Sequence, residues 1–107
     1  MENTEPKILP QKTVFDLSFV EILGSKGRCK ILRLLALKNE LNISEIVHNT
    51  GLSHTAITKH LNFLEKYALI QKKMFGRIRI YRFKDENFFA LALKRLVLFW
   101  EKNYDLL

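Results

Sequence analysis

Five side chains that donate or accept hydrogen bonds recur at helical spacing in one short segment. They are His54, Thr55, Thr58, Lys59 and Asn62, at relative positions i, i+1, i+4, i+5 and i+8. Because an α-helix turns once in about 3.6 residues, these positions share one polar face near the amino end of a helix. Directional hydrogen bonding from such a face is the chemistry needed to read the edges of nucleic-acid bases.

Positive charge is the second chemical feature, and it is concentrated between residues 59 and 84. This window holds eight Lys and Arg against Glu65 as its single acid, so it carries the entire net charge of +7. The eight are Lys59, Lys66, Lys72, Lys73, Arg77, Arg79, Arg82 and Lys84. A basic surface attracts polyanions because each neutralised phosphate releases counterions. Nucleic acid is the favoured partner; a solvated basic face and an anionic membrane surface are the alternatives.

Metal and catalytic chemistry have weaker support. The available metal ligands are His48, His54, His60 and Cys29, but His54 and His60 lie six apart on one helix and point in different directions. We expect no metal site and no cofactor, with His60 packed beneath its helix and Cys29 acting as a small, half-buried apolar residue. No Ser, His and Asp set, paired carboxylate site or glycine-rich phosphate loop is recognisable, so the chain is predicted not to be an enzyme.

The elements that position these residues follow from apolar periodicity and capping residues. The expected elements are helices over 14–23, 28–37, 44–49 and 53–67, a short extended piece at 41–43, a hairpin of 69–75 and 77–83 around Gly76, and a last helix over 88–104. The expected N-caps are Thr13 or Asp16, Ser25, Ser44, Ser53, and Asp85 or Asn87. Gly51 supplies the tight turn before the fourth helix.

The two elements that carry the polar and basic residues have distinct patterns. In the fourth helix, the apolar stripe opposite the polar face is formed by Ala56, Ile57, Leu61 and Leu64. In the hairpin, alternation is clearest where Ile78 and Ile80 alternate with Arg77 and Arg79, which predicts a basic tip. The sequence thus places a short helix and a turn before a polar-faced helix, then a basic β-ribbon.

This order predicts a winged helix-turn-helix fold. The fold class is mainly α with a small β-hairpin (α+β), built from five helices and a two- or three-stranded wing. The major groove of B-DNA, about 12 Å wide, admits one helix, and a hairpin can lie along the adjacent minor groove. Arginines such as Arg77 and Arg79 suit the negative potential of a narrow minor groove.

Composition bounds the remaining possibilities. With 48% hydrophobic residues, four Gly and two Pro, the 107-residue chain is expected to fold as one domain over 13–107 after a flexible tail at 1–12. Its longest apolar stretch is interrupted by Lys94 and Arg95 and is too short to cross a bilayer. The amino-terminal segment has no secretory-signal pattern, and a single cysteine fits a reducing compartment, so we expect a cytoplasmic protein without a membrane partner.

The last helix is apolar on nearly all sides, which one small domain cannot cover. A second copy of the chain is the natural cover, so the helices over 14–23 and 88–104 are predicted to form a twofold homodimer. The candidate dimerisation residues are Phe15, Phe19, Phe88, Leu91, Phe99 and Trp100. An effector pocket lined by Phe99 and Trp100 is the alternative.

Two segments resemble the ArsR family of winged-helix regulators. Leu23-Gly24-Ser25, Arg28 and Ile31-Leu32-Arg33-Leu34-Leu35 are similar to its opening, and Ile43-Ser44-Glu45-Ile46 followed by Thr50 to Leu64 is similar to its helix-turn-recognition-helix. The resemblance covers roughly residues 23–83. It implies a winged-helix fold, operator DNA binding and a homodimer formed by terminal helices.

The sequence departs from the family's pattern at two places. Metal-sensing members carry Cys-x-Cys in the short helix before the turn, whereas residues 44–49 contain no cysteine, so thiolate sensing is not expected. The usual glycine after the recognition helix is replaced by Tyr67-Ala68, so the exit toward the wing is expected to be mildly strained or differently shaped.

The function predicted from the sequence is that of a sequence-specific regulator of transcription that binds double-stranded DNA. The alternatives are an architectural DNA-binding protein with little base selectivity and a winged-helix module for protein interaction. The candidate DNA-binding residues are Ser53, His54, Thr55, Thr58, Lys59 and Asn62 on the recognition helix (53–67), and Lys72, Lys73, Arg77 and Arg79 on the wing (70–83), which contacts the backbone or minor groove.

Overall fold

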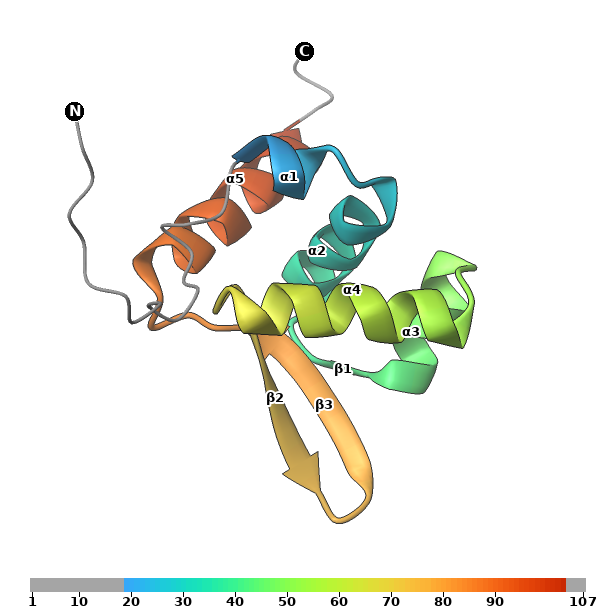
Figure 1. Cartoon of the computed structure of the whole chain (residues 1–107). Coiled ribbons are helices and arrows are strands. Elements are labelled where there is room, and N and C mark those ends of the chain that lie inside the picture. Colours follow the sequence, from blue (N-terminus) through green and yellow to red (C-terminus); the bar gives the residue numbers. More distant parts are fainter. Residues whose placement is uncertain (1–18, 104–107) are drawn as a thin grey trace, which may run out of the picture.

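The computed structural model describes residues 19–103, which form five α-helices and one three-stranded antiparallel sheet (Figure 1). In chain order the elements are α1 (Phe19–Leu23), α2 (Lys26–Lys38), β1 (Leu41–Asn42), α3 (Ile43–Thr50), α4 (His54–Lys66), β2 (Ile70–Phe75), β3 (Ile78–Phe83) and α5 (Phe88–Asn103). The predicted winged helix-turn-helix fold is confirmed. Its wing has three strands because β1 pairs with β3.

Three of the predicted N-caps are confirmed, namely Ser25, Ser53 and Asn87. The Ser25 hydroxyl accepts a hydrogen bond from the Arg28 amide at 3.2 Å and begins α2, which is longer than the expected 28–37. The Ser53 hydroxyl accepts one from the Ala56 amide at 3.1 Å and begins α4. Each cap satisfies an amide that would otherwise lack a partner in the first helical turn.

The cap of α3 was predicted wrongly, because it is Asn42 and not Ser44. The Asn42 side chain accepts from the Glu45 amide, and the Glu45 carboxylate accepts from the Asn42 amide, both at 2.8 Å. This reciprocal pair forms a capping box and satisfies two backbone donors. The residue three positions after Ser44 is Val47, whose side chain cannot accept a hydrogen bond from the Ser44 amide. The helix therefore begins earlier, after Asn42.

The first and last helices follow the prediction as far as the structure describes them. Of the helix expected over 14–23, the described part is Phe19–Leu23, and Phe15 lies outside the described residues. The last helix begins after Asn87, whose side-chain oxygen accepts from the Phe89 and Ala90 amides at 2.9 and 3.3 Å.

Helix α4 ends in a left-handed residue that is not glycine. The Leu69 amide donates to the Leu64 carbonyl and the Ala68 amide donates to the Glu65 carbonyl, both at 3.0 Å, which is the Schellman pattern. Ala68 has a φ of 63° in this turn. The strained exit expected from the missing glycine is therefore confirmed, and the turn leads directly into β2.

Replacing Ala68 with glycine is expected to stabilise the protein by about 0.5–1 kcal/mol. A left-handed L-residue costs roughly 1–2 kcal/mol, and the added freedom of glycine in the unfolded chain offsets part of the gain. Thermal unfolding measures the effect, with Gly51→Ala as the inverse control because Gly51 has a φ of 72° in open space. A lower Tm for Ala68→Gly would contradict this explanation of the turn.

The hydrophobic core lies beneath α4 and holds it against the rest of the molecule. Ile57, Leu61 and Leu64, three members of the predicted stripe, are fully buried, whereas Ala56 is half-buried. They join residues of α2 and the sheet in one cluster, which includes Ile31, Leu35, Leu69, Ile70, Tyr81 and Phe83. Burial of this stripe leaves the opposite face of α4 toward solvent.

The hairpin closes through a two-residue turn at Gly76 and Arg77. Phe75 pairs with Ile78 across it, and Gly76 has a φ of 63°, which fits a type II′ turn. The predicted alternation is present, but β3 packs against the core with Tyr81 and Phe83, whereas Ile78 is exposed. Period-2 alternation identifies two faces without showing which one meets the core.

Candidate nucleic-acid interface

The polar face predicted for α4 is exposed along the helix. Ser53, His54, Thr55, Lys59 and Asn62 are all exposed, and Thr58 is half-buried between them. Their positions follow from the burial of the opposite stripe, which fixes the rotation of the helix. This surface therefore presents hydroxyl, imidazole, ammonium and carboxamide groups together near the amino end of one helix.

His54 and Thr58 contact each other on this face. The Thr58 hydroxyl oxygen lies 3.4 Å from the Nδ1 atom of His54, one helical turn away. A contact at Nδ1 leaves Nε2 as the outward ring nitrogen of His54. Thr58 thus helps to orient the imidazole, which fits its half-buried position.

His60 lies away from this polar face, as expected. Its ring packs so closely against α2 that a side chain at Gly27 would clash with it. Partial burial, together with the positive charges of Arg28 and Lys59, lowers the pKa of His60 below its ordinary value. The imidazole is therefore neutral at neutral pH and serves the packing of α4 against α2.

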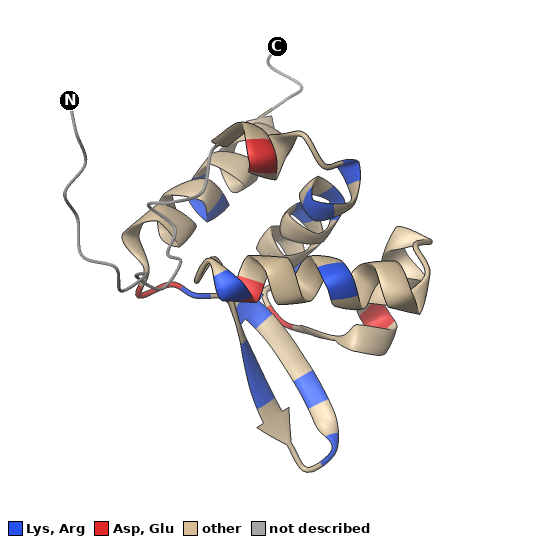
Figure 2. Cartoon of the chain, viewed as in Figure 1, with Lys and Arg blue, Asp and Glu red and all other residues tan. Residues whose placement is uncertain are grey.

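The wing carries the second group of predicted residues. Lys72, Lys73, Arg77 and Arg79 are all exposed, and the hairpin segment 70–83 contains no Asp or Glu. Pairing of Lys72 with Tyr81 and of Lys73 with Ile80 places the two lysines on opposite faces of the ribbon. Figure 2 shows basic residues along both strands and at the tip of the hairpin.

One basic residue of the window is neutralised. Arg82 forms ion pairs with Glu40 at 3.2 Å and with Asp85 at 3.3 Å, and Asp85 also pairs with Lys94 at 3.4 Å. Its charge therefore stabilises the base of the wing and contributes little to the field at the tip. Glu40 lies 42 residues away along the chain, so sequence proximity could not reveal this pairing.

A groove of about 340 Å³ joins the wing to the amino end of α4. Its lining residues are Asn42, Ile43, Ser44, His54, Arg77, Ile78 and Arg79. It brings His54 of the recognition helix together with both wing arginines. Ser44 also lines it, although the sequence suggested this residue only as a helix cap.

Helices α1 and α5 lie away from the tip of the wing (Figure 1), and their exposed apolar side chains form a separate apolar surface. Four predicted dimerisation residues are exposed there, namely Phe19, Phe88, Phe99 and Trp100, whereas Leu91 is half-buried. Leu23 and Leu96 are also exposed and were missed by the sequence reasoning. On α5 the spacing of Phe88, Ala92, Leu96 and Phe99 could have identified one helical stripe.

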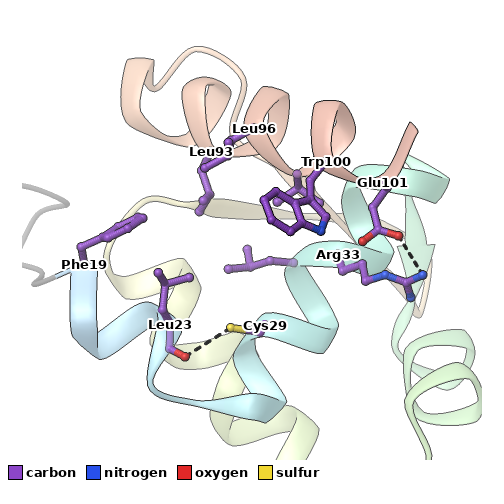
Figure 3. Close-up of a pocket in the computed structure, with 10 residues that line it drawn as sticks. Phe19, Leu23, Cys29, Arg33, Leu93, Leu96, Trp100 and Glu101 are labelled. Carbon is purple, nitrogen blue, oxygen red and sulfur yellow. Dashed lines mark hydrogen bonds and ion pairs between the residues drawn. The ribbon is translucent and has the colours of Figure 1, made fainter. Parts of the chain in front are cut away.

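Part of this surface is hollowed between α1, α2 and α5. The cavity measures about 500 Å³ and is lined mainly by apolar side chains, including Phe19, Leu96 and Trp100 (Figure 3). At its rim the Arg33 guanidinium lies 2.9 Å from the Glu101 carboxylate. This carboxylate raises the pKa of Arg33 above its ordinary value.

Cys29 lies at the wall of the same cavity. The half-buried thiol donates to the carbonyl oxygen of Leu23 at 3.6 Å (Figure 3) and also lies 3.7 Å from that of Ile22. Cys29 thus occupies the small, half-buried position that its surroundings in the sequence predicted.

Comparison with known proteins decides the family. The family description "Bacterial regulatory protein, arsR family" matches residues 25–72. YuzN of Bacillus subtilis, an uncharacterized HTH-type transcriptional regulator, is 32% identical over 84 residues, covering 73% of this chain and 86% of that protein. The chain belongs to the ArsR family. This assignment favours a transcriptional regulator over an architectural protein or a protein-interaction module.

Solved structures support the fold of this ArsR-family regulator. Reduced HlyU from Vibrio cholerae superposes with a TM-score of 0.66 at 22% identity, covering 79% of this chain and 83% of that one. A possible transcriptional regulator for arsenical resistance superposes with a TM-score of 0.60 at 27% identity, covering 78% and 85%. Both alignments extend beyond the helix-turn-helix, so they include most of the described elements.

The ArsR-family regulator lacks the metal-sensing Cys-x-Cys in α3, as its sequence already indicated. Within residues 19–103, no three His, Cys, Asp or Glu side chains gather closely enough to hold a metal ion. In the same range, every helix is too short or too polar to cross a lipid bilayer.

Proposed function

We propose that this ArsR-family regulator binds a partly palindromic DNA duplex as a homodimer and thereby controls transcription. One observation carries the proposal: the polar face of α4 and the basic wing meet at one groove, lined by His54, Arg77 and Arg79. A single duplex can contact both elements there, with a helix in one groove and a ribbon beside it.

The recognition helix supplies base contacts in this proposal. Its exposed residues Thr55, Lys59 and Asn62 lie within about the first three turns of α4, and the amino-terminal part of such helices reaches base edges. Lysine pairs with the acceptors of guanine, and asparagine with the adenine edge. The Ser53 hydroxyl already caps the helix, so its remaining capacity suits a backbone phosphate.

The wing supplies backbone and minor-groove contacts. Among the described residues, no carboxylate forms an ion pair with Lys72, Lys73, Arg77 or Arg79, whereas Arg82 pairs with both Glu40 and Asp85. Free cations on a projecting ribbon neutralise phosphates and fix the register of the recognition helix.

The apolar face of α1 and α5 supports the homodimer. One exposed apolar stripe is formed by Phe88, Leu96 and Phe99. A second copy of the chain, related by a twofold axis, would bury both stripes against each other. Two recognition helices placed about 34 Å apart would read half-sites separated by one turn of DNA. The cavity beside Trp100 then becomes part of the interface.

The polar groups of the site serve recognition, so we propose that the protein is not an enzyme and works without a cofactor. The family of transcriptional regulators and the helices of the described range both fit action on DNA in the cytoplasm.

Base reading and phosphate binding are separated by Lys59→Ala and Arg77→Ala. Lys59→Ala is expected to weaken binding to the cognate site about 5–150-fold, because a base contact is worth about 1–3 kcal/mol. Its effect on binding to random DNA is expected to be much smaller. Arg77→Ala is expected to weaken binding to all DNA sequences about equally. It is also expected to lower the salt slope, the dependence of log affinity on log salt concentration, by about one. Fluorescence anisotropy over a range of salt concentrations measures both.

Lys102→Ala is the matched control for these variants. It also removes one exposed positive charge, but Lys102 lies near the end of α5, at the opposite end of the molecule from the wing (Figure 1). Its salt slope is expected to remain that of the wild type. If both variants lost the same affinity for cognate and for random DNA, the assignment of base reading to Lys59 and of phosphate binding to Arg77 would be wrong.

A further inference from the structure

The tip of the wing exposes three large apolar side chains, which phosphate binding does not explain. Met74, Phe75 and Ile78 are 54%, 60% and 54% exposed, although Phe, Met and Ile are among the residues most often buried. They flank the turn at Gly76 and Arg77, and the hairpin projects away from the helices (Figure 1). No described element of the same chain covers them.

The strand register joins two of these residues, Phe75 and Ile78, in a wedge with charged flanks and places Met74 on the other face. Phe75 lies directly opposite Ile78, so their side chains adjoin on one face at the very end of the ribbon. Met74 lies opposite Arg79 on the other face. Arg77 occupies the turn itself, so the apolar pair is bordered by arginines.

The charge of the wing identifies the kind of partner that this wedge meets. The wing combines an apolar tip with four unpaired basic side chains and no acidic residue. These features favour a polyanionic partner that also offers an apolar surface. Stacked bases behind a phosphate backbone have this character, and so does an anionic membrane. DNA is favoured because Ile78 lines the same groove as His54, which places the wedge beside the recognition helix.

We propose that Phe75 and Ile78 insert as a wedge into the minor groove and partly unstack one base step, bending the duplex. This inference rests on the proposed function and adds a mode of recognition to it. Proteins that insert Phe, Ile or Met between base pairs kink DNA by about 20–90° toward the major groove. Arg77 and Arg79 hold the flanking phosphates while the apolar pair enters.

The wedge has a consequence for sequence preference. Pyrimidine–purine steps such as TA and CA unstack most readily, so they favour a bent complex without any hydrogen bond to their bases. Duplexes bound by the wild type are therefore expected to carry such a step where the wing lies, outside the major-groove contacts of α4. A Phe75→Ser/Ile78→Ser variant loses this preference and keeps the preference read by α4.

The bend itself is the test, measured by resonance energy transfer between dyes at the two ends of a selected duplex. Anisotropy on the same samples reports binding. The wild type is expected to shorten the end-to-end distance, whereas Phe75→Ser/Ile78→Ser at saturating concentration leaves the duplex nearly straight with an unchanged salt slope. Met74→Ser is the control on the other face and should bend DNA as the wild type does.

Each alternative result has a definite meaning. If the wild type binds a duplex without bending it, or if Phe75→Ser/Ile78→Ser bends it equally, the proposed insertion of Phe75 and Ile78 is wrong. The proposed function then still stands. If the wild type binds no duplex at all, both fail. If the wild type binds vesicles of anionic lipid through Phe75 and Ile78 and leaves DNA straight, the tip belongs to a membrane contact and the wedge is overturned.

Discussion

Replacing Leu96 with glutamate is expected to separate the proposed homodimer into monomers. Leu96 lies on the exposed apolar stripe of α5, between Phe88 and Phe99. A carboxylate buried there without a partner costs several kcal/mol, and every 1.4 kcal/mol weakens association about tenfold. We expect the dimer dissociation constant to rise about a hundredfold or more, with a comparable loss of affinity for a duplex that contains two half-sites.

Leu37→Glu is the matched control for this experiment. Leu37 is likewise an exposed leucine in a helix, but it lies on α2 outside the apolar face. Sedimentation is expected to find a dimer for the wild type and for Leu37→Glu, and a monomer for Leu96→Glu. A wild-type monomer, or a Leu96→Glu protein that still dimerises, would rule out the proposed interface.

Replacing Leu61 with alanine is expected to cost about 3 kcal/mol of stability. Leu61 lies on the buried face of α4, fully buried in the cluster that joins α4 to α2 and the sheet. Leucine-to-alanine changes in close-packed cores leave a cavity and cost about 2–5 kcal/mol. For a domain of this size each kcal/mol shifts the Tm by about 4–8 °C, so a decrease of at least about 10 °C is expected.

Calorimetry at one fixed protein concentration measures this shift, because the proposed dimerisation would make the Tm depend on concentration. Leu37→Ala provides the same chemical change at an exposed position and is expected to alter the stability by no more than about 0.5 kcal/mol. If the two variants unfolded at the same temperature, the assigned packing of α4 would be wrong.

Features that depend on neighbours in sequence were predictable. Ser25 and Ser53 cap helices through bonds that span three residues, and the polar face of α4 follows from helical periodicity. The unusual turn at Ala68 was also visible, because the glycine expected there is absent. The order of elements then sufficed to predict a winged helix-turn-helix.

One local feature was missed. Glu45 gives Asn42 a reciprocal bond that Ser44 lacks, and this capping box, which spans only three residues, sets the start of α3.

Features that depend on distant contacts were not predictable. Arg82 resembles the other wing cations in sequence, but folding brings Glu40 against it. Exposure of Phe75 and Ile78 arises because the hairpin extends past the body of the domain, which alternation alone cannot indicate.

We propose that the protein reads a DNA sequence through α4 and holds the duplex through its wing. Selection of bound duplexes from a random pool, followed by affinity measurements against salt, tests it most directly. We predict a partly palindromic consensus with half-sites about one helical turn apart, bound at least about a thousandfold more tightly than random DNA. An unenriched pool, bound with steep and equal salt slopes, would contradict the claim.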